Sequence, residues 1–417
     1  MFLEFKDIAK QKFVARKKRF FDDYPDIFTK MYEFTRAKTA RALGYYPYFP
    51  KIEASDTTEV TIDGEQKIML GSNNYLGLTN HPEVIEAGVK ALRKYGAGLT
   101  GSRFLNGNII LHDQLEEQIA EFVGKEKSLV FSTGFGVNLG VIATIAGPSD
   151  LIFSDELNHA SIVDGARFSR SRVVRFSHNN MDDLERRLSN ADSEKARFIV
   201  SDGIFSMEGD IVDLPEMIRV AREYGCRVMI DDAHALGVIG PRGDGTAAHF
   251  GLTDQVDLIM GTFSKSLASV GGFIAGEEPV IDYLKHHTRT MIFTAALPPS
   301  NVATVSKALE ILQREPERAT QVKENAKYVR ENLHSMGYDT GESTTPVVPV
   351  IIGEEMKTFS VWKELMKNGV YTNPVIPPAV PPRRSLLRTS YMATHTREQL
   401  DFCLEAFRKA GKKYKVI

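Results

Sequence analysis

Cysteine is scarce in this chain of 417 residues, which carries only Cys226 and Cys403. Two cysteines so far apart provide neither a disulfide framework nor the spacing of a metal site, and His286-His287 has no further ligand at useful spacing. The amino terminus also lacks the apolar segment of a secretory signal, because Glu4 and other charged residues interrupt it. We therefore expect a protein without a bound metal that works in the reducing cytoplasm.

Neither sign of charge is in excess, since 52 Lys and Arg residues face 54 Asp and Glu residues. This balance argues against a nucleic-acid-binding protein, which would show a basic surplus or a basic stripe. Long hydrophobic runs are also missing. Residues 128–149 carry no charge, but their serine, threonine, glycine, asparagine and proline make them too polar for a membrane span. We interpret this stretch as a buried strand, a glycine turn and a helix.

Three regions follow one another along the chain. Residues 1–60 form an N-terminal arm that is rich in aromatic and basic residues, without a strand pattern, and it includes the basic cluster Arg16–Arg19. We expect the arm to pack on the body or on a second subunit, with peripheral contact to the inner membrane as the alternative. Residues 61–295 are predicted to form a large cofactor-binding domain, and residues 296–417 a smaller α+β domain with helices over residues 301–314, 319–336 and 397–412.

The large domain is predicted to be an α/β fold with a mostly parallel central sheet. Short apolar runs, each followed by a polar cluster, recur at residues 129–131, 151–153, 198–200, 228–230 and 258–260. Helix-like segments such as residues 214–224 separate several of them. Continuous apolar strands between amphipathic helices are typical of a parallel sheet covered on both faces. Ligands of such sheets bind at the carboxyl ends of the strands, so we expect the reactive residues there.

Two familiar glycine motifs do not explain the chain. Gly96-Ala-Gly98-Leu-Thr-Gly101 matches the dinucleotide fingerprint in its letters, but a helix over residues 84–95 precedes it where the fingerprint needs a strand. We interpret it as a loop after a helix. The Gly-x-Ser-x-Gly elbow of the α/β-hydrolases does not occur. A nicotinamide or flavin enzyme and a serine hydrolase are therefore disfavoured.

A lysine that follows a buried strand is the strongest sign of chemistry. Lys265 lies in Gly261-Thr-Phe-Ser-Lys265-Ser266, and a buried lysine is costly unless it is paired, exposed or covalently used. Lysine forms a Schiff base with an aldehyde, which points to pyridoxal 5'-phosphate. Asp231 directly follows another apolar run. It can pair with the ring nitrogen of that cofactor and keep the ring an electron sink.

Further partners for this cofactor lie at neighbouring strand ends. His159 is a candidate to stack on the ring, and His234 is a candidate to reach its 3′-oxygen. The phosphate suits the free N–H groups at a helix start and hydroxyls beside Lys265. The residues that offer these groups are Gly134, Phe135, Thr262 and Ser264. Each signal alone is common in proteins without a cofactor, but their joint order along the strands predicts a pyridoxal-phosphate enzyme.

Several segments together resemble the α-oxoamine synthases, which are pyridoxal-phosphate enzymes of fold type I. These segments are Asn73-Asn-Tyr-Leu-Gly-Leu78, Gly101-Ser-Arg-Phe-Leu-Asn-Gly107, Asn158-His-Ala-Ser-Ile162, Asp231-Asp-Ala-His234, Gly261-Thr-Phe-Ser-Lys-Ser266 and Phe293-Thr-Ala295. The resemblance runs from about residue 60 to the carboxyl end. The pattern is most similar to the soluble bacterial members that use L-serine, and the segment Pro377-Pro-Ala-Val-Pro381 supports this.

The resemblance implies a decarboxylative Claisen condensation of L-serine with a long-chain acyl-CoA, which yields a 3-keto long-chain base, CoA and CO2. It implies that Lys265 holds the cofactor and removes the Cα proton, while His159 also contacts the substrate carboxylate. Arg388 is the implied ion-pair partner of that carboxylate, and Asn74 the implied partner of the acyl-derived oxygen. It further implies a homodimer with active sites at the interface, where Thr294 reaches the phosphate bound by the neighbouring subunit.

Alternatives stay open at this level. The same residues fit related enzymes that use glycine with acetyl-CoA or alanine with pimeloyl-CoA. A catalytically inactive partner subunit would be expected to lack the Schiff-base lysine, whereas Lys265 is present. A membrane-binding module led by the arm explains only a small part of the chain. Arg388 has a structural alternative, a salt bridge within the smaller domain, and Arg383 and Arg384 have no match in the family pattern.

Overall fold

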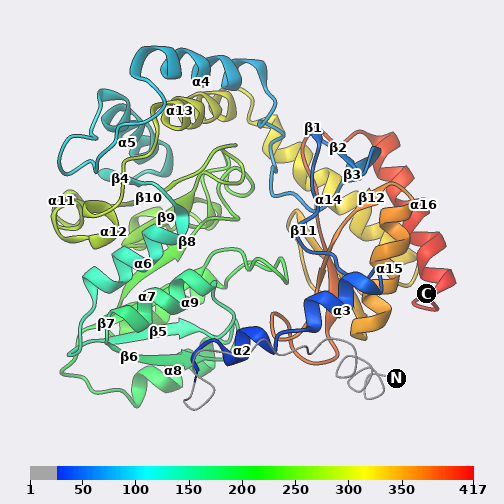
Figure 1. Cartoon of the computed structure of the whole chain (residues 1–417). Helices are drawn as coiled ribbons and strands as arrows, with labels where there is room; N and C mark the ends of the chain where they lie inside the picture. Colours follow the sequence, from blue (N-terminus) through cyan, green and yellow to red (C-terminus); the bar gives the residue numbers. More distant parts are fainter. Residues whose placement is uncertain (1–25) are drawn as a thin grey trace.

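The chain folds around a seven-stranded sheet, in a computed structural model that describes residues 26–417 (Figure 1). Its strands are β4 (Lys127–Phe131), β5 (Leu151–Asp155), β6 (Arg172–Phe176), β7 (Arg197–Asp202), β8 (Arg227–Asp231), β9 (Leu258–Thr262) and β10 (Gly272–Gly276). They stand in the order β4-β10-β9-β8-β7-β5-β6, parallel from β9 to β6, with β10 antiparallel to both of its neighbours. The predicted mostly parallel α/β fold is confirmed, and each of the five apolar runs lies within a strand.

Helices cover both faces of this sheet. Successive side chains of a strand point to opposite faces, so Val228 and Ile230 of β8 lie in one core and Met229 in the other. The helices of the first core are α4 (Pro82–Tyr95), α5 (Ile110–Val123), α8 (Met181–Ser189), α9 (Leu214–Glu223) and α13 (Pro299–Arg314). Those of the second are α6 (Gly134–Ile145), α7 (Ala160–Phe168), α11 (Glu278–His287) and α12 (Arg289–Ile292). Burial on both faces explains why the strands are continuously apolar.

The uncharged stretch over residues 128–149 folds as its sequence predicts. Strand β4 ends at Phe131, a short turn follows, and α6 begins at Gly134 with Thr133 as its cap. The Thr133 hydroxyl accepts a hydrogen bond from the Gly136 N–H at 3.0 Å. The glycines at positions 96–101 likewise form a loop after α4. None of the helices in the described part combines the length and the apolar character that a bilayer crossing needs.

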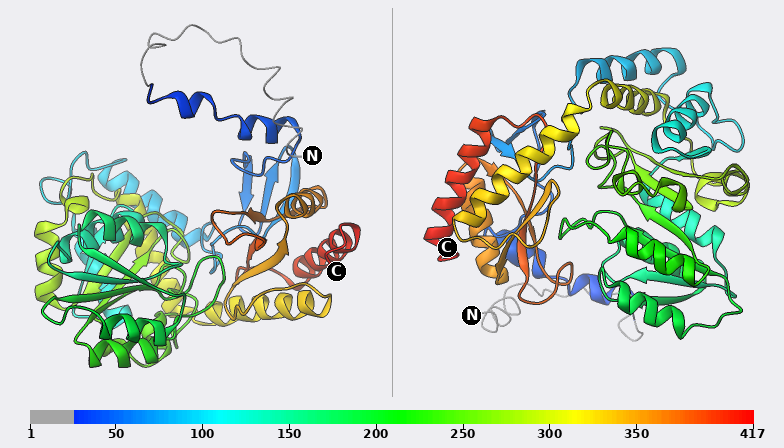
Figure 2. Two further views of the ribbon diagram at one scale, coloured as in Figure 1. Left: turned by 90° about the horizontal axis from the view of Figure 1, so that it is seen from below. Right: turned by 180° about the vertical axis from the view of Figure 1, so that it is seen from behind.

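A smaller body packs beside the large one, and the chain enters it through α14 (Glu317–Ser335) after α13 (Figure 2). Its three-stranded sheet is β11 (Val347–Gly353), β14 (Ser385–Ser390) and β13 (Asn373–Val375), all antiparallel. Helices α15 (Glu355–Lys367) and α16 (Arg397–Lys413) share a core with these strands and with α14. The helices predicted over residues 301–314, 319–336 and 397–412 are present.

Four further strands join the start of the described chain to the smaller body. They are β1 (Ala54–Asp56), β2 (Glu59–Ile62), β3 (Glu65–Met69) and β12 (Val370–Tyr371), in the order β1-β2-β3-β12. The sequence pattern shows no strand before residue 60, because β1 has three residues that are all exposed, and β2 has only four residues, alternately half-buried and buried. The boundary at residue 61 divides β2. We therefore propose that residues 54–69 belong with the smaller body.

The described part of the N-terminal arm lies along the protein and carries two short helices, α2 (Thr29–Tyr32) and α3 (Arg36–Ala42). Just after α3, the Lys363 amine of α15 lies 4.7 Å from the centre of the Tyr45 ring. This contact fits the expectation that the arm packs on the body. The amphipathic opening of the arm and the cluster Arg16–Arg19 lie outside the described residues.

Candidate active site

Lys265 lies in the turn that follows β9, at the carboxyl end of the sheet. Burial lowers the pKa of its amine to about 8, although the nearby carboxylates of Asp231 and Asp202 favour the charged form. A lysine with such a pKa is neutral in a substantial fraction of molecules near neutral pH. It can therefore act as a nucleophile toward an aldehyde or accept a proton, which an exposed lysine does poorly.

Asp231 ends β8 as a buried carboxylate with fixed orientation. One oxygen accepts a hydrogen bond from the Asn138 side-chain amide at 2.6 Å, and the other accepts the Ala233 N–H at 2.9 Å. Asn138 comes from α6 and also donates to the Ser161 hydroxyl at 2.9 Å. A carboxylate held in this way can pair with a cationic ring nitrogen, as the sequence predicts for Asp231.

His159 stands at the start of α7, with an exposed ring beside this carboxylate. Its Nδ1 lies 2.7 Å from the Ser161 hydroxyl, and its backbone N–H donates to Asp202 at 2.9 Å. Although the residue is exposed, the protein around its ring displaces part of the surrounding water. This desolvation, together with the charge of Lys265, lowers the pKa of His159 against the opposing effect of Asp231. Burial and the negative charge of Asp231 raise the pKa of Asp202 well above its ordinary value. An uncharged, open imidazole face is suited to stacking on an aromatic ring.

His234 is buried on the other side of the site. Its Nδ1 lies 2.7 Å from the Tyr75 hydroxyl, which in turn lies 3.3 Å from the Asn73 side-chain oxygen. Burial and the positive charges of Lys265 and Arg388 lower the pKa of His234 well below its ordinary value. A neutral His234 can hydrogen-bond a ring oxygen, which agrees with its predicted place beside the cofactor.

The residues predicted to bind the phosphate come together where α6 begins beside β9. A Cβ atom added to Gly134 would lie 2.6 Å from the Thr262 hydroxyl, so glycine allows the helix start to approach the strand. The Thr262 and Ser264 hydroxyls lie 3.0 Å apart. The first N–H groups of α6, including that of Phe135, have no acceptor within the helix. Hydroxyl and N–H groups gathered at a helix start fit a phosphate. Thr294, by contrast, is exposed in the segment after α12.

Arg388 is buried in β14 with all of its contacts to uncharged groups. It donates to the Ser206 carbonyl at 2.6 Å, the Ser390 hydroxyl at 2.8 Å and the Asn73 side-chain oxygen at 2.9 Å. No carboxylate within residues 26–417 forms an ion pair with it. The structural salt bridge considered for Arg388 is therefore not found in the described chain. A buried guanidinium without an anionic partner suits a substrate carboxylate.

The two asparagines of the Asn-Asn-Tyr segment make different contacts. The Asn74 amide donates to the Thr79 hydroxyl at 2.8 Å, and its oxygen accepts the Leu78 N–H at 3.1 Å. Asn74 is thus engaged in its own turn, whereas Asn73 faces Arg388. The structure therefore adds Asn73 as a partner of Arg388, and the contact of Asn74 with the acyl-derived oxygen stays a prediction.

These groups together fit pyridoxal phosphate. A nucleophilic amine, a buried carboxylate, a stacking imidazole and a phosphate cradle meet at one edge of the sheet, as the chemistry of that cofactor requires. Sequence reasoning missed four residues of the surrounding network: Asn73, Tyr75, Asn138 and Asp202. Asn138 follows Gly134 by one helical turn and Asp202 ends a predicted strand, so both positions carried a signal. Tyr75 and Asn73 carried none beyond their segment.

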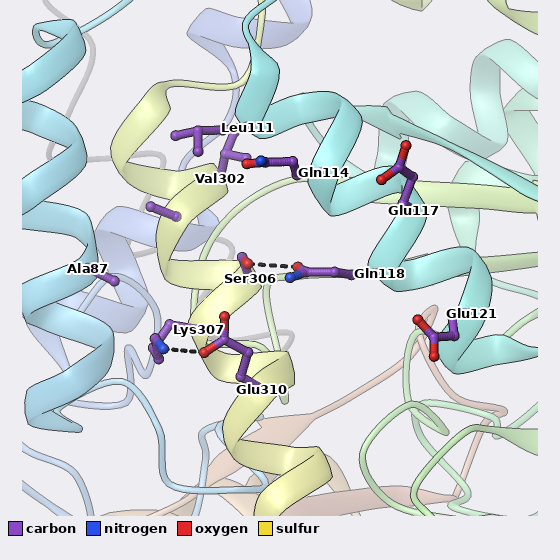
Figure 3. A pocket seen from close by; sticks show the side chains of 11 residues that line it. Ala87, Leu111, Gln114, Glu117, Gln118, Glu121, Val302, Ser306, Lys307 and Glu310 are labelled. Carbon is purple, nitrogen blue, oxygen red and sulfur yellow. Dashed lines mark hydrogen bonds and ion pairs between the residues drawn. The ribbon is translucent and has the colours of Figure 1, made fainter.

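A separate hollow of about 500 Å³ lies between helices of the large body (Figure 3). It is lined by residues of α4, α5 and α13, including Gln118, Ser306 and Lys307. The Ser306 hydroxyl donates to Gln118 at 2.7 Å, and Lys307 pairs with Glu310. None of the predicted site residues lines this hollow. It carries no part of the chemistry described above.

The whole chain resembles proteins of known activity. A family model for aminotransferase class I and II matches residues 65–407. The serine palmitoyltransferase of Sphingobacterium spiritivorum is 52% identical, over 92% of this chain and 96% of that protein. An 8-amino-7-oxononanoate synthase of Thermoanaerobacter pseudethanolicus is 43% identical over 90% and 95%.

The fold has equally close solved counterparts. A serine palmitoyltransferase variant from S. paucimobilis, solved with a bound PLP-myriocin aldimine, superimposes with a TM-score of 0.92 and 37% identity, over 94% of this chain and 100% of that one. The predicted resemblance is thus confirmed across both bodies of the protein. The chain belongs to the aminotransferase class I and II family, within the group that includes the serine palmitoyltransferases.

Proposed function

We propose that this protein condenses L-serine with a long-chain acyl-CoA, such as palmitoyl-CoA, and releases CoA and CO2. The product is 3-ketodihydrosphingosine, the first intermediate of sphingolipid synthesis. The observation that carries this proposal is the buried, carboxylate-free guanidinium of Arg388 beside the Lys265 and Asp231 network. The identity of 52% to a serine palmitoyltransferase supports serine as the amino acid.

Pyridoxal phosphate, when bound, supplies an electron sink for negative charge at the substrate Cα. Lys265 holds the cofactor, Asp231 pairs with its ring nitrogen, and His159 and His234 border its ring. The phosphate contacts are assigned to Gly134, Phe135, Thr262 and Ser264, and to Thr294 of a partner subunit. These assignments make a homodimer part of the proposal.

Each side chain has a defined task in the reaction. The Lys265 amine, once released from the cofactor, removes the Cα proton, because its lowered pKa leaves it neutral often enough to act as a base. Asp231, held in one orientation by the Asn138 amide and the Ala233 N–H, would accept a hydrogen bond from the ring nitrogen and so hold a proton there. Arg388 binds the serine carboxylate through two parallel N–H groups and orients it for departure as CO2. His159 borders the same carboxylate from the ring side.

The pH dependence of cofactor loading tests the state of Lys265. In the cofactor-free protein, the rate of pyridoxal phosphate attachment should rise with pH and level off above about 8, because the amine is protonated below its pKa and nucleophilic above it. An ordinary lysine would give the same rise near 10.5. The rate is measured from the cofactor absorbance, with Lys265→Ala as the blank. A midpoint at the ordinary lysine value would contradict the assigned environment.

Replacing Arg388 with alanine should weaken L-serine binding about 100-fold, the scale for removing one partner of a buried charge pair. Serine binding is measured by titration of the cofactor absorbance, together with cofactor content and thermal melting. Arg408→Ala is the matched control, because Arg408 is an exposed arginine of α16 that pairs with Glu405 and has no proposed role in the site. If Arg388→Ala binds serine normally but melts earlier, Arg388 is structural and the carboxylate partner must be sought among His159, Arg383 and Arg384.

One experiment separates the proposed substrates from those of related enzymes. L-serine, glycine and L-alanine are added separately to purified protein, and the change in cofactor absorbance is recorded. Products are then assayed with acetyl-CoA, pimeloyl-CoA and long-chain acyl-CoAs. We expect a response to L-serine and a long-chain product. A preference for alanine with pimeloyl-CoA would place the activity with the 8-amino-7-oxononanoate synthases, and no response to any amino acid would indicate an inactive subunit.

Cytoplasmic location and peripheral contact with the inner membrane are also proposed. Apolar side chains are exposed next to basic ones in the described arm, among them Ile27, Phe28 and Met31 near Lys30. Such a pattern suits an anionic lipid surface. Flotation with anionic vesicles, with and without residues 1–50, tests it. Equal flotation of both forms would exclude the arm as the membrane contact.

A further inference from the structure

A short hairpin over residues 203–212 joins the two halves of the active site. At its start, the Gly203 N–H donates to the Asp231 carbonyl at 2.8 Å. Further along, the Ser206 carbonyl accepts a hydrogen bond from Arg388 at 2.6 Å. The hairpin is therefore bonded at its start to Asp231, the residue assigned to the ring nitrogen. It also contacts Arg388, the residue assigned to the substrate carboxylate.

The hairpin has a defined shape and is anchored at its tip. The Phe205 N–H donates to the Asp210 carbonyl at 3.0 Å, and the Gly209 N–H donates to the Phe205 carbonyl at 2.9 Å. The Gly209 carbonyl accepts the hydroxyls of Ser343 at 3.1 Å and Thr345 at 2.8 Å, both from the smaller body. Gly209 has φ +72°, where a residue with a side chain would be strained. A Cβ atom added to Gly209 would also collide with the Ser343 side chain.

His178 connects this hairpin to the central sheet. It follows β6, and its Nδ1 lies 3.1 Å from Asp155, a buried carboxylate at the end of β5. Its Nε2 lies 3.0 Å from Asp210 of the hairpin. The His178 ring also meets the Phe205 ring edge-on, with 4.4 Å between centroids. Phe205 directly precedes Ser206, whose carbonyl holds Arg388.

Two carboxylates keep His178 charged. Burial opposes the charged form, but the hydrogen bonds to Asp155 and Asp210 outweigh it and raise the pKa of His178 to about 10. Both ring nitrogens then carry protons and donate, one to each carboxylate. Such charge-assisted hydrogen bonds are stronger than neutral ones, and they tie the hairpin to β5. No step of the proposed reaction uses His178 directly.

We propose that His178 is a positioning residue for the substrate carboxylate, because it holds the hairpin through Asp210 and the hairpin holds Arg388. This inference rests on the proposed function, in which Arg388 binds L-serine. Of the three groups that contact Arg388, Ser390 belongs to its own strand, while the Ser206 carbonyl comes from the large body. A guanidinium must be held in one orientation to bind a carboxylate through two N–H groups. Disorder in the hairpin would therefore weaken serine binding and leave acyl-CoA binding unchanged.

Asp210→Asn tests this inference with little change of shape. It removes the charge on the hairpin side and leaves His178 paired with Asp155. Asp257→Asn is the matched control, because the Asp257 side chain is 23% exposed against 22% for Asp210 and also forms an ion pair, with Arg227. His178→Gln is the second variant, and it removes the charge of the histidine that pairs with Asp210.

Two readouts are needed. Hydrogen exchange of the Phe205 and Gly209 amides in cofactor-free protein reports the order of the hairpin without any activity. Titration of the cofactor absorbance with L-serine, followed by measurement of KM for serine and for acyl-CoA, shows whether Arg388 still binds the serine carboxylate. We expect faster exchange in Asp210→Asn, a dissociation constant for serine about tenfold higher, and an unchanged KM for acyl-CoA. Asp257→Asn should change neither readout.

Three outcomes would overturn the inference. If the hairpin amides exchange at the original rate, the ion pair does not order the hairpin. If they exchange faster while serine binds normally, His178 has a structural role only. If the unsubstituted protein does not respond to L-serine, the proposed function fails together with the inference that rests on it, and this failure is recognised because it needs no substitution.

Discussion

Lys265→Ala is expected to lower turnover about 10⁴-fold or more, the scale for removal of a central catalytic group. The variant loses the amine that we propose to hold the cofactor and to remove the Cα proton. It should keep its fold, because burial disfavours the charged form of this lysine and alanine removes that cost. Borohydride reduction followed by mass spectrometry measures the covalent bond to the cofactor, and product formation measures turnover.

Lys125→Ala is the matched control for this substitution. Lys125 is also partly buried, and burial lowers its pKa as well. Its amine donates to the carbonyls of Thr253 and Val256, each at 2.6 Å, which is a structural role. We expect Lys125→Ala to lose stability and to keep turnover. A reducible bond to the cofactor in Lys265→Ala would show that another lysine holds it.

Asp231→Asn should lower turnover about 10³-fold, on the scale of losing a key electrostatic contact to the reacting group. The neutral amide cannot balance a cationic ring nitrogen, so negative charge at the substrate Cα is no longer stabilised. The lysine and the cofactor bond should persist. Exchange of the serine Cα proton with deuterated water, followed by NMR, measures this step separately from the later ones.

The neighbouring carboxylate provides a strict comparison. Asp232 is as deeply buried as Asp231, and burial raises its pKa to about 7. Its side chain accepts the Thr246 N–H at 2.9 Å, away from the predicted ring nitrogen. Because Asp232 is already neutral in a large fraction of molecules, Asp232→Asn should keep nearly full Cα exchange. Normal exchange in Asp231→Asn, or an equal loss in both variants, would refute the assigned role of Asp231.

Local pattern predicted the sheet and the residues at its carboxyl edge. Lys265, Asp231 and His159 each follow an apolar run, and parallel strands bring such ends to one edge whatever the loops between them do. His234 follows Asp231 by three residues, so it shares the same place. This part of the site needed only the order of strands and the chemistry of the side chains.

Tertiary structure decided the contacts that join distant segments. Asn73 and Arg388 are 315 residues apart, and no periodicity indicates that one asparagine of a pair faces the guanidinium while the other closes its own turn. The pairing of β3 with β12 also joins distant segments, and it is the basis for the proposal that residues 54–69 belong with the smaller body. The link from Asp155 through His178 and Asp210 to Arg388 likewise joins separate segments, namely the end of β5, the turn after β6, the hairpin and β14.

Sequence by itself therefore determined the fold class and the chemistry of the cofactor, because these depend on side-chain types at the ends of locally encoded strands. Its motifs also carried the resemblance to the family and the prediction of Arg388. Only the tertiary structure decided which groups surround Arg388, the residue proposed to bind the amino-acid carboxylate. That geometry depends on side-chain direction and on packing between segments far apart in the chain. Neither can be read from the apolar pattern of the sequence, because that pattern is the same whether Asn73 or Asn74 faces Arg388.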